Sequence, residues 1–253
     1  MALTWSGRRQ ILYSGVGAVI VLVLLIFIYE TYFTAPPTCF DGKQDGAETG
    51  VDCGGTCSLI CADAAHPPVV AWARAFQTSA SSYNAVAYVQ NNNIGAGARG
   101  VPYSFQLFDA NNILIAERDG VTDLPPLQII PVTEPTISTG SRVVARTLFA
   151  FTSDPPAVWN KVPQGAYPQF TISQPTHTAD FSKLSATLIS NNVGDVTNVS
   201  LVAIVYDQND TAIASSKSLV ARVAGRSHVP IFFTWPEGVP NAVRFEIIVL
   251  PSF

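Results

Sequence analysis

The residues most capable of chemistry lie in one short segment, residues 39–61, which holds every cysteine of the chain: Cys39, Cys53, Cys57 and Cys61. Their even number and close spacing predict two disulfides that close a module too small to bury a core of its own. The sequence leaves the three pairings open. Zinc held by four thiolates is the alternative, because Cys53-x3-Cys57-x3-Cys61 is a permissible metal spacing. We favour disulfides, because the segment follows a membrane anchor and is expected in an oxidising compartment.

The same segment carries four acidic residues among several glycines: Asp41, Asp45, Glu48 and Asp52. Their spacing would place them on one face of a helix, but glycine at this density opposes helix formation. In a glycine-rich loop, carboxylates and backbone carbonyls can converge on a hard cation, so the sequence suggests calcium as a cofactor. The alternative is that these acids are solvated turn formers that cap backbone amides.

The remaining side chains offer little for catalysis. His66, His177 and His228 lie far apart in the sequence, and no His-x3-His pair or nucleophile elbow accompanies them. The sequence therefore predicts a protein that is not an enzyme, with a hydrolase or its accessory subunit as the alternative. The net charge of −4, with 14 scattered basic residues, argues against nucleic acid as a partner.

The cysteine segment is similar to a pattern that recurs in exported bacterial proteins, Cys-x-Asp-Gly-x-x-Asn-Gly-x-Glu-Thr-x-x-Asp-Cys-Gly-Gly-x-Cys. Asp45 stands in the place of the Asn in that pattern. The resemblance implies export and says little about a ligand.

An apolar stretch before this segment, Ile11 to Tyr29, contains no charged residue. As a helix it would be roughly 28 Å long, enough to cross the hydrocarbon core of a bilayer. We predict a transmembrane helix over residues 11–33, with the lipid bilayer as its partner. Arg8 and Arg9 precede the stretch, so residues 1–10 are expected in the cytoplasm and the rest of the chain outside. A cleaved signal is the alternative, but the stretch is long and no small-x-small cleavage site follows it.

Residues 69–253 contain two copies of one pattern. Residues 108–116 and 206–214 share an aromatic residue, Asp, Asn, Ile and Ala in the same register. Apolar residues alternate before each copy, as expected of half-buried strands. The runs that begin at Asp109 and Asp207 favour tight turns, so each copy is expected to contain a hairpin.

No window outside the anchor has helical periodicity, and each copy spans about 85 to 100 residues, a size typical of an immunoglobulin-like sandwich. The predicted fold is mainly β, with two tandem immunoglobulin-like β-sandwiches after one transmembrane helix and a small disulfide-rich segment. The expected domains are a cysteine-rich acidic module and linker over 34–68, a first sandwich over 69–163 and a second over 164–253. Trp72, Trp159 and Trp235 are expected in cores or between domains rather than on a sugar-stacking surface.

A family resemblance agrees with this fold. The residues Phe105-Gln-Leu-Phe108-Asp109 resemble the Phe-x-Leu-Tyr-Asp signature of FxLYD domains, immunoglobulin-like modules of exported bacterial and archaeal proteins. Phe108 replaces the tyrosine of the signature. The second copy keeps Tyr206-Asp207 but departs at the two preceding apolar positions, Ala203 and Val205. The resemblance implies a fold and an extracytoplasmic setting, and the family brings no agreed activity.

Residues 124–137 contain four prolines, which cannot donate to a sheet ladder, so this segment is expected at a sheet edge or in an exposed loop. Together with the acidic module, it is our candidate docking site for a protein or glycan partner; the alternative is that it only shields a sheet edge. The expected function is a membrane-anchored extracytoplasmic protein, a non-catalytic binding or structural component of the cell envelope. The alternative function is a calcium-dependent adhesin or a carbohydrate-binding surface protein.

Overall fold

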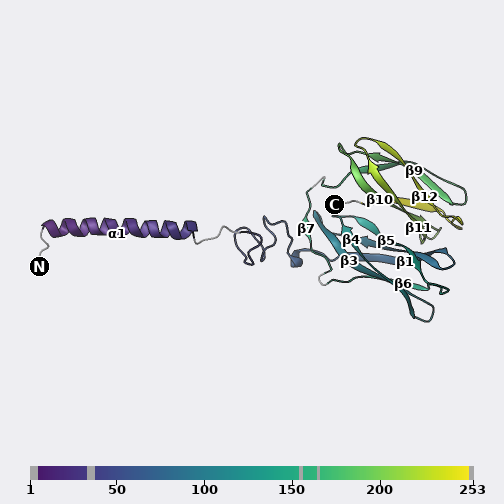
Figure 1. Cartoon of the computed structure of the whole chain (residues 1–253), viewed down its shortest axis with the longest axis horizontal. Helices are drawn as coiled ribbons and strands as arrows, with labels where there is room; N and C mark the ends of the chain where they lie inside the picture. The colour runs from purple at the N-terminus through teal and green to yellow at the C-terminus, as the bar shows by residue number, and fades with distance from the viewer. Residues whose placement is uncertain (1–4, 33–37, 154–155, 164–165, 251–253) are drawn as a thin grey trace. The chain divides into compact units, whose positions relative to one another are not determined.

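The computed structural model describes residues 5–32, 38–153, 156–163 and 166–250 (Figure 1). The chain divides into two compact units, residues 1–57 and residues 58–253, each of which is described by itself.

The first unit begins with helix α1, Trp5–Tyr32, which is exposed along the part from Arg9 to Glu30. This part has 22 residues and is apolar enough to cross a membrane. Its length is about 33 Å at 1.5 Å per residue, close to the thickness of a hydrocarbon core. The helix starts before the predicted boundary at residue 11, because no proline separates Trp5 from the apolar stretch. The predicted end at residue 33 lies outside the described residues.

The cysteine segment folds into turns, with one short 3-10 helix, η1, at Ala62–Ala64. Cys39 and Cys57 form a disulfide with their Cα atoms 5.6 Å apart. Cys53 and Cys61 are disulfide-bonded as well, so no cysteine of the chain is free. The prediction of two disulfides is confirmed, and the alternative of four zinc-binding thiolates is wrong, because a disulfide sulfur is no longer a thiolate.

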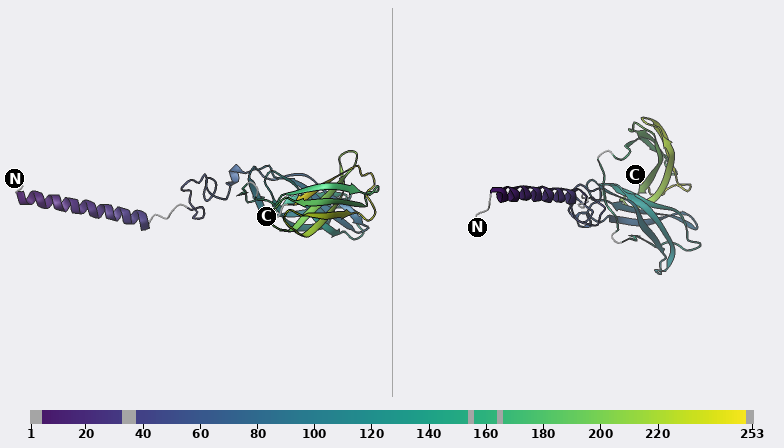
Figure 2. Two further views of the ribbon diagram at one scale, coloured as in Figure 1. Left: turned by 90° about the horizontal axis from the view of Figure 1, so that it is seen from above. Right: turned by 60° about the vertical axis from the view of Figure 1, so that its left-hand side comes forward.

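The second unit consists mainly of β-strands, as predicted. The strands are β1 Val69–Ser79, β2 Ser82–Gln90, β3 Ala96–Phe108, β4 Leu114–Leu124, β5 Ile129–Ser138, β6 Arg146–Phe151, β7 Asn160–Lys161, β8 Phe170–His177, β9 Lys183–Ser190, β10 Val196–Tyr206, β11 Ala212–Val223, β12 His228–Thr234 and β13 Arg244–Leu250. We call β1–β6 the N-terminal body and β8–β13 the C-terminal body; the two form separate groups of strands in Figure 2.

The two bodies have the same strand order. In the N-terminal body the sheets are β1-β2-β5 and β4-β3-β6, and the short β7 also pairs with β3. In the C-terminal body they are β8-β9-β12 and β11-β10-β13, so each strand of the first body has a counterpart at the same place in the second. The pairings within these sheets are antiparallel.

Each body has its own hydrophobic core between its two sheets. In β3 the residues Phe105 and Leu107 point inward, and in β10 their counterparts are Ala203 and Val205, all of them fully buried. Strand residues two apart share a face, which is why these apolar positions alternate with more polar ones. The two tryptophans in these cores are Trp159 in the N-terminal body and Trp235 in the C-terminal body.

A third cluster joins the two bodies through the outer faces of two sheets. It contains Phe76, Val86, Val202, Ile204, Tyr206 and Ala212. Strands β2 and β10 are therefore buried on both faces, which explains their nearly continuous apolar sequences. Trp72 stacks on Tyr88 beside this cluster, with ring centroids 5.1 Å apart. The guanidinium of Arg74 donates a hydrogen bond of 3.0 Å across the interface to the carbonyl oxygen of Ala212.

The two matched turns have the same hydrogen bonds. The N–H of Asp109 donates to the carbonyl of Ile113 at 3.0 Å, and its Oδ1 accepts the N–H groups of Asn111 at 2.9 Å and Ile113 at 3.0 Å. Asp207 makes the three corresponding bonds at 3.0, 2.8 and 2.9 Å. The carboxylate thus replaces a backbone carbonyl in each turn, as aspartate commonly does.

The strand residue before each turn is an aromatic that pairs with an arginine. Phe108 lies opposite Arg146 in the register, and Tyr206 lies opposite Arg244. The guanidinium carbons are 4.7 Å and 3.9 Å from the two ring centroids. The aromatic that departs from the FxLYD signature, Phe108, therefore occupies the same place as Tyr206.

Candidate functional site

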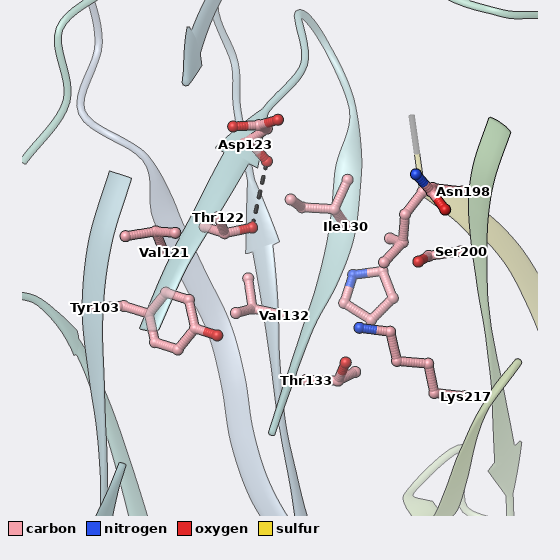
Figure 3. A pocket seen from close by; sticks show the side chains of 12 residues that line it. Tyr103, Val121, Thr122, Asp123, Ile130, Val132, Thr133, Asn198, Ser200 and Lys217 are labelled. Carbon is pink, nitrogen blue, oxygen red and sulfur yellow. Dashed lines mark hydrogen bonds between the residues drawn. The ribbon is translucent and has the colours of Figure 1, made fainter. Parts of the chain in front are cut away.

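A groove of about 320 Å³ lies where the N-terminal body meets the C-terminal body (Figure 3). The N-terminal body contributes Tyr103, Val121, Thr122, Asp123, Ile130, Pro131, Val132 and Thr133; the C-terminal body contributes Asn198, Ser200, Lys217 and Leu250. Its volume is at the lower end of the range for small-molecule sites, about 300 to 1,000 Å³.

The groove exists because two edge strands leave one side of the N-terminal body open. Strand β4 is the edge of one sheet and β5 is the edge of the other. The apolar residues of the lining include Val121, which is exposed, and Ile130 and Val132, which are mostly buried in the core of the N-terminal body. The proline-rich segment 124–137 supplies part of this site, since residues 129–138 form the edge strand β5, as predicted.

A tyrosine and a glycine shape one end of the groove. The hydroxyl of Tyr103 donates a hydrogen bond of 2.7 Å to Oε1 of Glu134. Burial, followed by this bond to Glu134, raises the pKa of Tyr103, so its hydroxyl stays protonated at neutral pH. A Cβ atom at Gly120 would lie 2.5 Å from that hydroxyl and 2.8 Å from the same Oε1, so only glycine fits there.

The polar rim carries two groups whose bonding capacity is unused. The Oγ1 atom of Thr133 is buried and has no hydrogen-bond partner. Lys217 is exposed and, among the described residues, its ammonium forms no ion pair. Asp123 is partly engaged, because its Oδ1 accepts the N–H of Gly100 at 2.8 Å. Lys217 and the second oxygen of Asp123 can bind a polar ligand, whereas Oγ1 of Thr133 is not accessible from the groove in this rotamer.

Asn198 and Ser200 complete the rim from β10. Asn198 is exposed and has a left-handed backbone with φ of 55°, a conformation that asparagine adopts more readily than most residues. The lining contains no histidine and no cysteine. The arrangement suits binding by hydrogen bonds and one positive charge.

Two of the four carboxylates of the acidic module cap turns. The two side-chain oxygens of Asp52 accept the N–H of Asp41 at 2.9 Å and that of Gly42 at 2.9 Å. The Oδ1 of Asp41 accepts the N–H of Lys43 at 2.9 Å. These bonds agree with the alternative in which the acids are turn formers.

The other two carboxylates are less well satisfied. Oε2 of Glu48 accepts the N–H of Asp52 at 3.2 Å, whereas Oδ1 of Asp45 is buried without a hydrogen-bond partner. Burial, and then the nearby charges of Asp41 and Glu48, raise the pKa of Asp45. Among the described residues no three of these carboxylates have oxygens within 4.8 Å of one another, so a cation would have to draw them closer together.

The sulfurs of this module are not available as ligands. The Sγ atom of Cys57 lies 3.1 Å from Oε1 of Glu48, but it is bonded to Cys39 and carries no proton or negative charge. A cation here would be held by oxygen atoms alone, which is the preference of calcium.

Sequence reasoning did not find Lys217, Asn198 or Ser200 as site residues. The signal for them is absent, because they join the groove only through the packing of one body on the other.

Comparison with known protein families finds no match, and neither does comparison with curated proteins. The resemblance to FxLYD domains therefore stays a prediction. Among solved structures, the chain is similar to a β-glucuronidase from Parabacteroides merdae, with 9% sequence identity and a TM-score of 0.17. The similarity covers 86% of this chain and 33% of that protein. A TM-score this low defines no shared fold.

Proposed function

We propose that the chain is a single-pass membrane-anchored extracytoplasmic protein, a non-catalytic binding component of the cell envelope that holds a polar ligand in the groove between its two bodies. The observation that carries this proposal is the groove itself, where the exposed ammonium of Lys217 forms no ion pair among the described residues. A hydrogen bond to a charged group contributes about 1.5 to 3 kcal/mol, so a polar ligand that bonds to Lys217 would be favoured.

The strand arrangement supports two tandem immunoglobulin-like sandwiches within this proposal. Strands 1, 2 and 5 of each body form one sheet, and strands 3, 4 and 6 form the other. In immunoglobulin lettering these are A, B and E in one sheet and C, C′ and F in the other, without D and G.

The membrane setting rests on helix α1 and on the charges around it. Arg8 and Arg9 precede the apolar part, and Glu30 ends it, which supports a cytoplasmic N-terminus. Four disulfide-bonded cysteines support an oxidising compartment for the rest of the chain. Protease treatment of intact cells tests this orientation: the β-strand unit should be degraded without lysis.

The ligand-binding role is tested with the full chain in detergent and a soluble fraction of the native envelope. Ser200→Trp would fill the groove, whereas Gln208→Trp adds the same side chain to an exposed turn of the C-terminal body. We expect wild type and Gln208→Trp to retain an envelope component that Ser200→Trp does not. Equal retention by all three proteins would contradict a ligand in this groove.

A calcium-dependent adhesin is the second candidate, and the unpartnered Oδ1 of Asp45 favours it. In this version calcium would bind among Asp41, Asp45, Glu48 and Asp52 and would stiffen the acidic module. Calcium titration of the full chain separates the two candidates, because the groove contains only one carboxylate, that of Asp123, and would not respond to calcium.

A further inference from the structure

The single cation of the groove points to a negatively charged ligand group. Lys217 pairs with Val202 in the β10–β11 register, so the two side chains share one face of the sheet. Val202 is fully buried in the cluster between the bodies, so this face is turned toward the N-terminal body. In Figure 3 the Lys217 side chain extends from its strand toward Thr133.

The uncharged polar groups around Lys217 suit hydroxyl groups on the ligand. Ser200 and Asn198 line one wall from strand β10. Asp123 uses Oδ1 to accept a backbone N–H, and its Oδ2 can accept a bond from the ligand. A ligand hydroxyl can donate to the carboxylate of Asp123 and can either donate to or accept from Ser200 and Asn198.

The groove offers no flat aromatic face. Val121 is exposed and can contact the C–H groups of a saturated ring, whereas Ile130 and Val132 are buried. Tyr103 is the one aromatic residue of the lining, and only 4% of it is exposed. A planar base or aromatic ring would therefore find no stacking partner here, in contrast to sites that bind nucleic-acid bases.

The balance of charge selects among anions. Lys217 supplies one positive charge and Asp123 one negative charge, so the groove has no net charge to offset a second charge on a ligand. A phosphate carries nearly two negative charges at neutral pH and is normally bound by several donors or by arginine. A carboxylate, with one charge, matches one ammonium.

We propose that the groove binds an acidic saccharide, with the carboxylate of the sugar on Lys217 and its hydroxyls on Asn198, Ser200 and Asp123. This proposal rests on the binding role proposed above and names the class of ligand for the same site. Neither a sugar-stacking tryptophan nor a metal is needed in it.

Isothermal titration of the full chain in detergent tests the proposal, with trigalacturonic acid as the probe. Maltotriose serves as the neutral saccharide, and a short poly-glutamate peptide supplies carboxylates without sugar hydroxyls. Lys217→Gln removes the proposed contact, and Lys183→Gln is the matched control, because Lys183 lies over the ring of Phe232, outside the groove.

We expect trigalacturonic acid to bind wild type and Lys183→Gln equally and to bind Lys217→Gln about tenfold to a hundredfold more weakly, as expected for one lost bond to a charged group. Maltotriose and the peptide should both bind wild type more weakly than trigalacturonic acid. Equal binding of trigalacturonic acid to Lys217→Gln, equal binding of maltotriose, tighter binding of the peptide, or no binding of trigalacturonic acid would each overturn the proposal. The binding role itself would survive those outcomes if Ser200→Trp still lost the envelope component.

Discussion

The hydroxyl of Tyr88 in the N-terminal body donates a hydrogen bond of 2.9 Å to Oε2 of Glu246 in the C-terminal body. The same oxygen accepts a bond of 3.1 Å from Tyr206. One carboxylate thus satisfies a tyrosine from each body, beside the apolar cluster that joins them. This contact makes the interface specific, because Tyr88 would be left without its acceptor if the bodies separated or slid, whereas Tyr206 belongs to the same body as Glu246 and would keep it.

The first prediction concerns alkaline pH. Burial, followed by the Glu246 carboxylate, raises the pKa of Tyr88 above its ordinary value of 10.0. In the unfolded chain this tyrosine ionises near pH 10, whereas in the folded chain it stays protonated. Its contribution to stability is therefore full below about pH 10 and is lost as the pH rises from there toward the folded-state pKa. In Tyr88→Phe the free energy of unfolding should fall less steeply with rising pH than in wild type. Denaturant unfolding measured across alkaline pH checks this, and the same pH dependence in both proteins would contradict the role of Tyr88.

The second prediction concerns Asp45. Because its folded-state pKa is raised, the protonated form favours folding at acidic pH, and that contribution is lost as the pH rises through the raised pKa. Asp45→Asn mimics the neutral form, so without calcium it should raise the melting temperature of the acidic module. With calcium the order should reverse, because wild type gains a bound cation and the variant does not.

Calorimetry of the full chain with calcium or with a chelator provides the measurement. Asp63→Asn is the control, since Asp63 is exposed in the short helix η1. If calcium raises the melting temperature of wild type and Asp45→Asn equally, the proposed cation site is wrong.

The sequence was sufficient for the features that depend on local chemistry. The apolar run of α1, the oxidised cysteines and the predominance of strands follow from composition and spacing, and each is present in the structure. The turn residues Asp109 and Asp207 were identified from residue type alone, because aspartate bonds to its own backbone a few residues ahead. The proline-rich segment was placed at a sheet edge because proline lacks the N–H that an inner strand must donate.

The groove could not be predicted from the sequence, because it depends on how one body packs on the other. Lys217 lies in a strand where exposed and half-buried residues alternate, a pattern that any solvent-facing strand would show. The double burial of β2 was also missed: Val86 has an ordinary apolar side chain, and only the structure places it against Val202. Contacts between residues more than a hundred positions apart leave no periodic signal in one sequence.

The third prediction concerns Gly120 beside the groove. Gly120→Ala should destabilise the chain by about 1 to 3 kcal/mol, because the new methyl group would overlap the Tyr103 hydroxyl. Adding Tyr103→Phe removes the nearest atom and should recover part of the loss. Gly194→Ala is the control, since nothing lies within 4 Å of a Cβ there. Equilibrium unfolding of the variants provides the comparison, and a neutral Gly120→Ala would mean that the groove wall can move.

The last prediction tests whether the two bodies are equivalent in energy as well as in strand order. Asp109→Ala and Asp207→Ala each remove a carboxylate oxygen that accepts two backbone N–H groups, so each should cost about 1 to 2 kcal/mol. Replacement of either aspartate by asparagine keeps a side-chain oxygen and should lower the free energy of unfolding less than replacement by alanine. The two turns belong to different bodies and share no hydrogen bond, so the double Ala variant should lose the sum of the single losses. Equilibrium unfolding measures all of these; a large effect at one turn and none at the other would show that the shared geometry does not reflect a shared role.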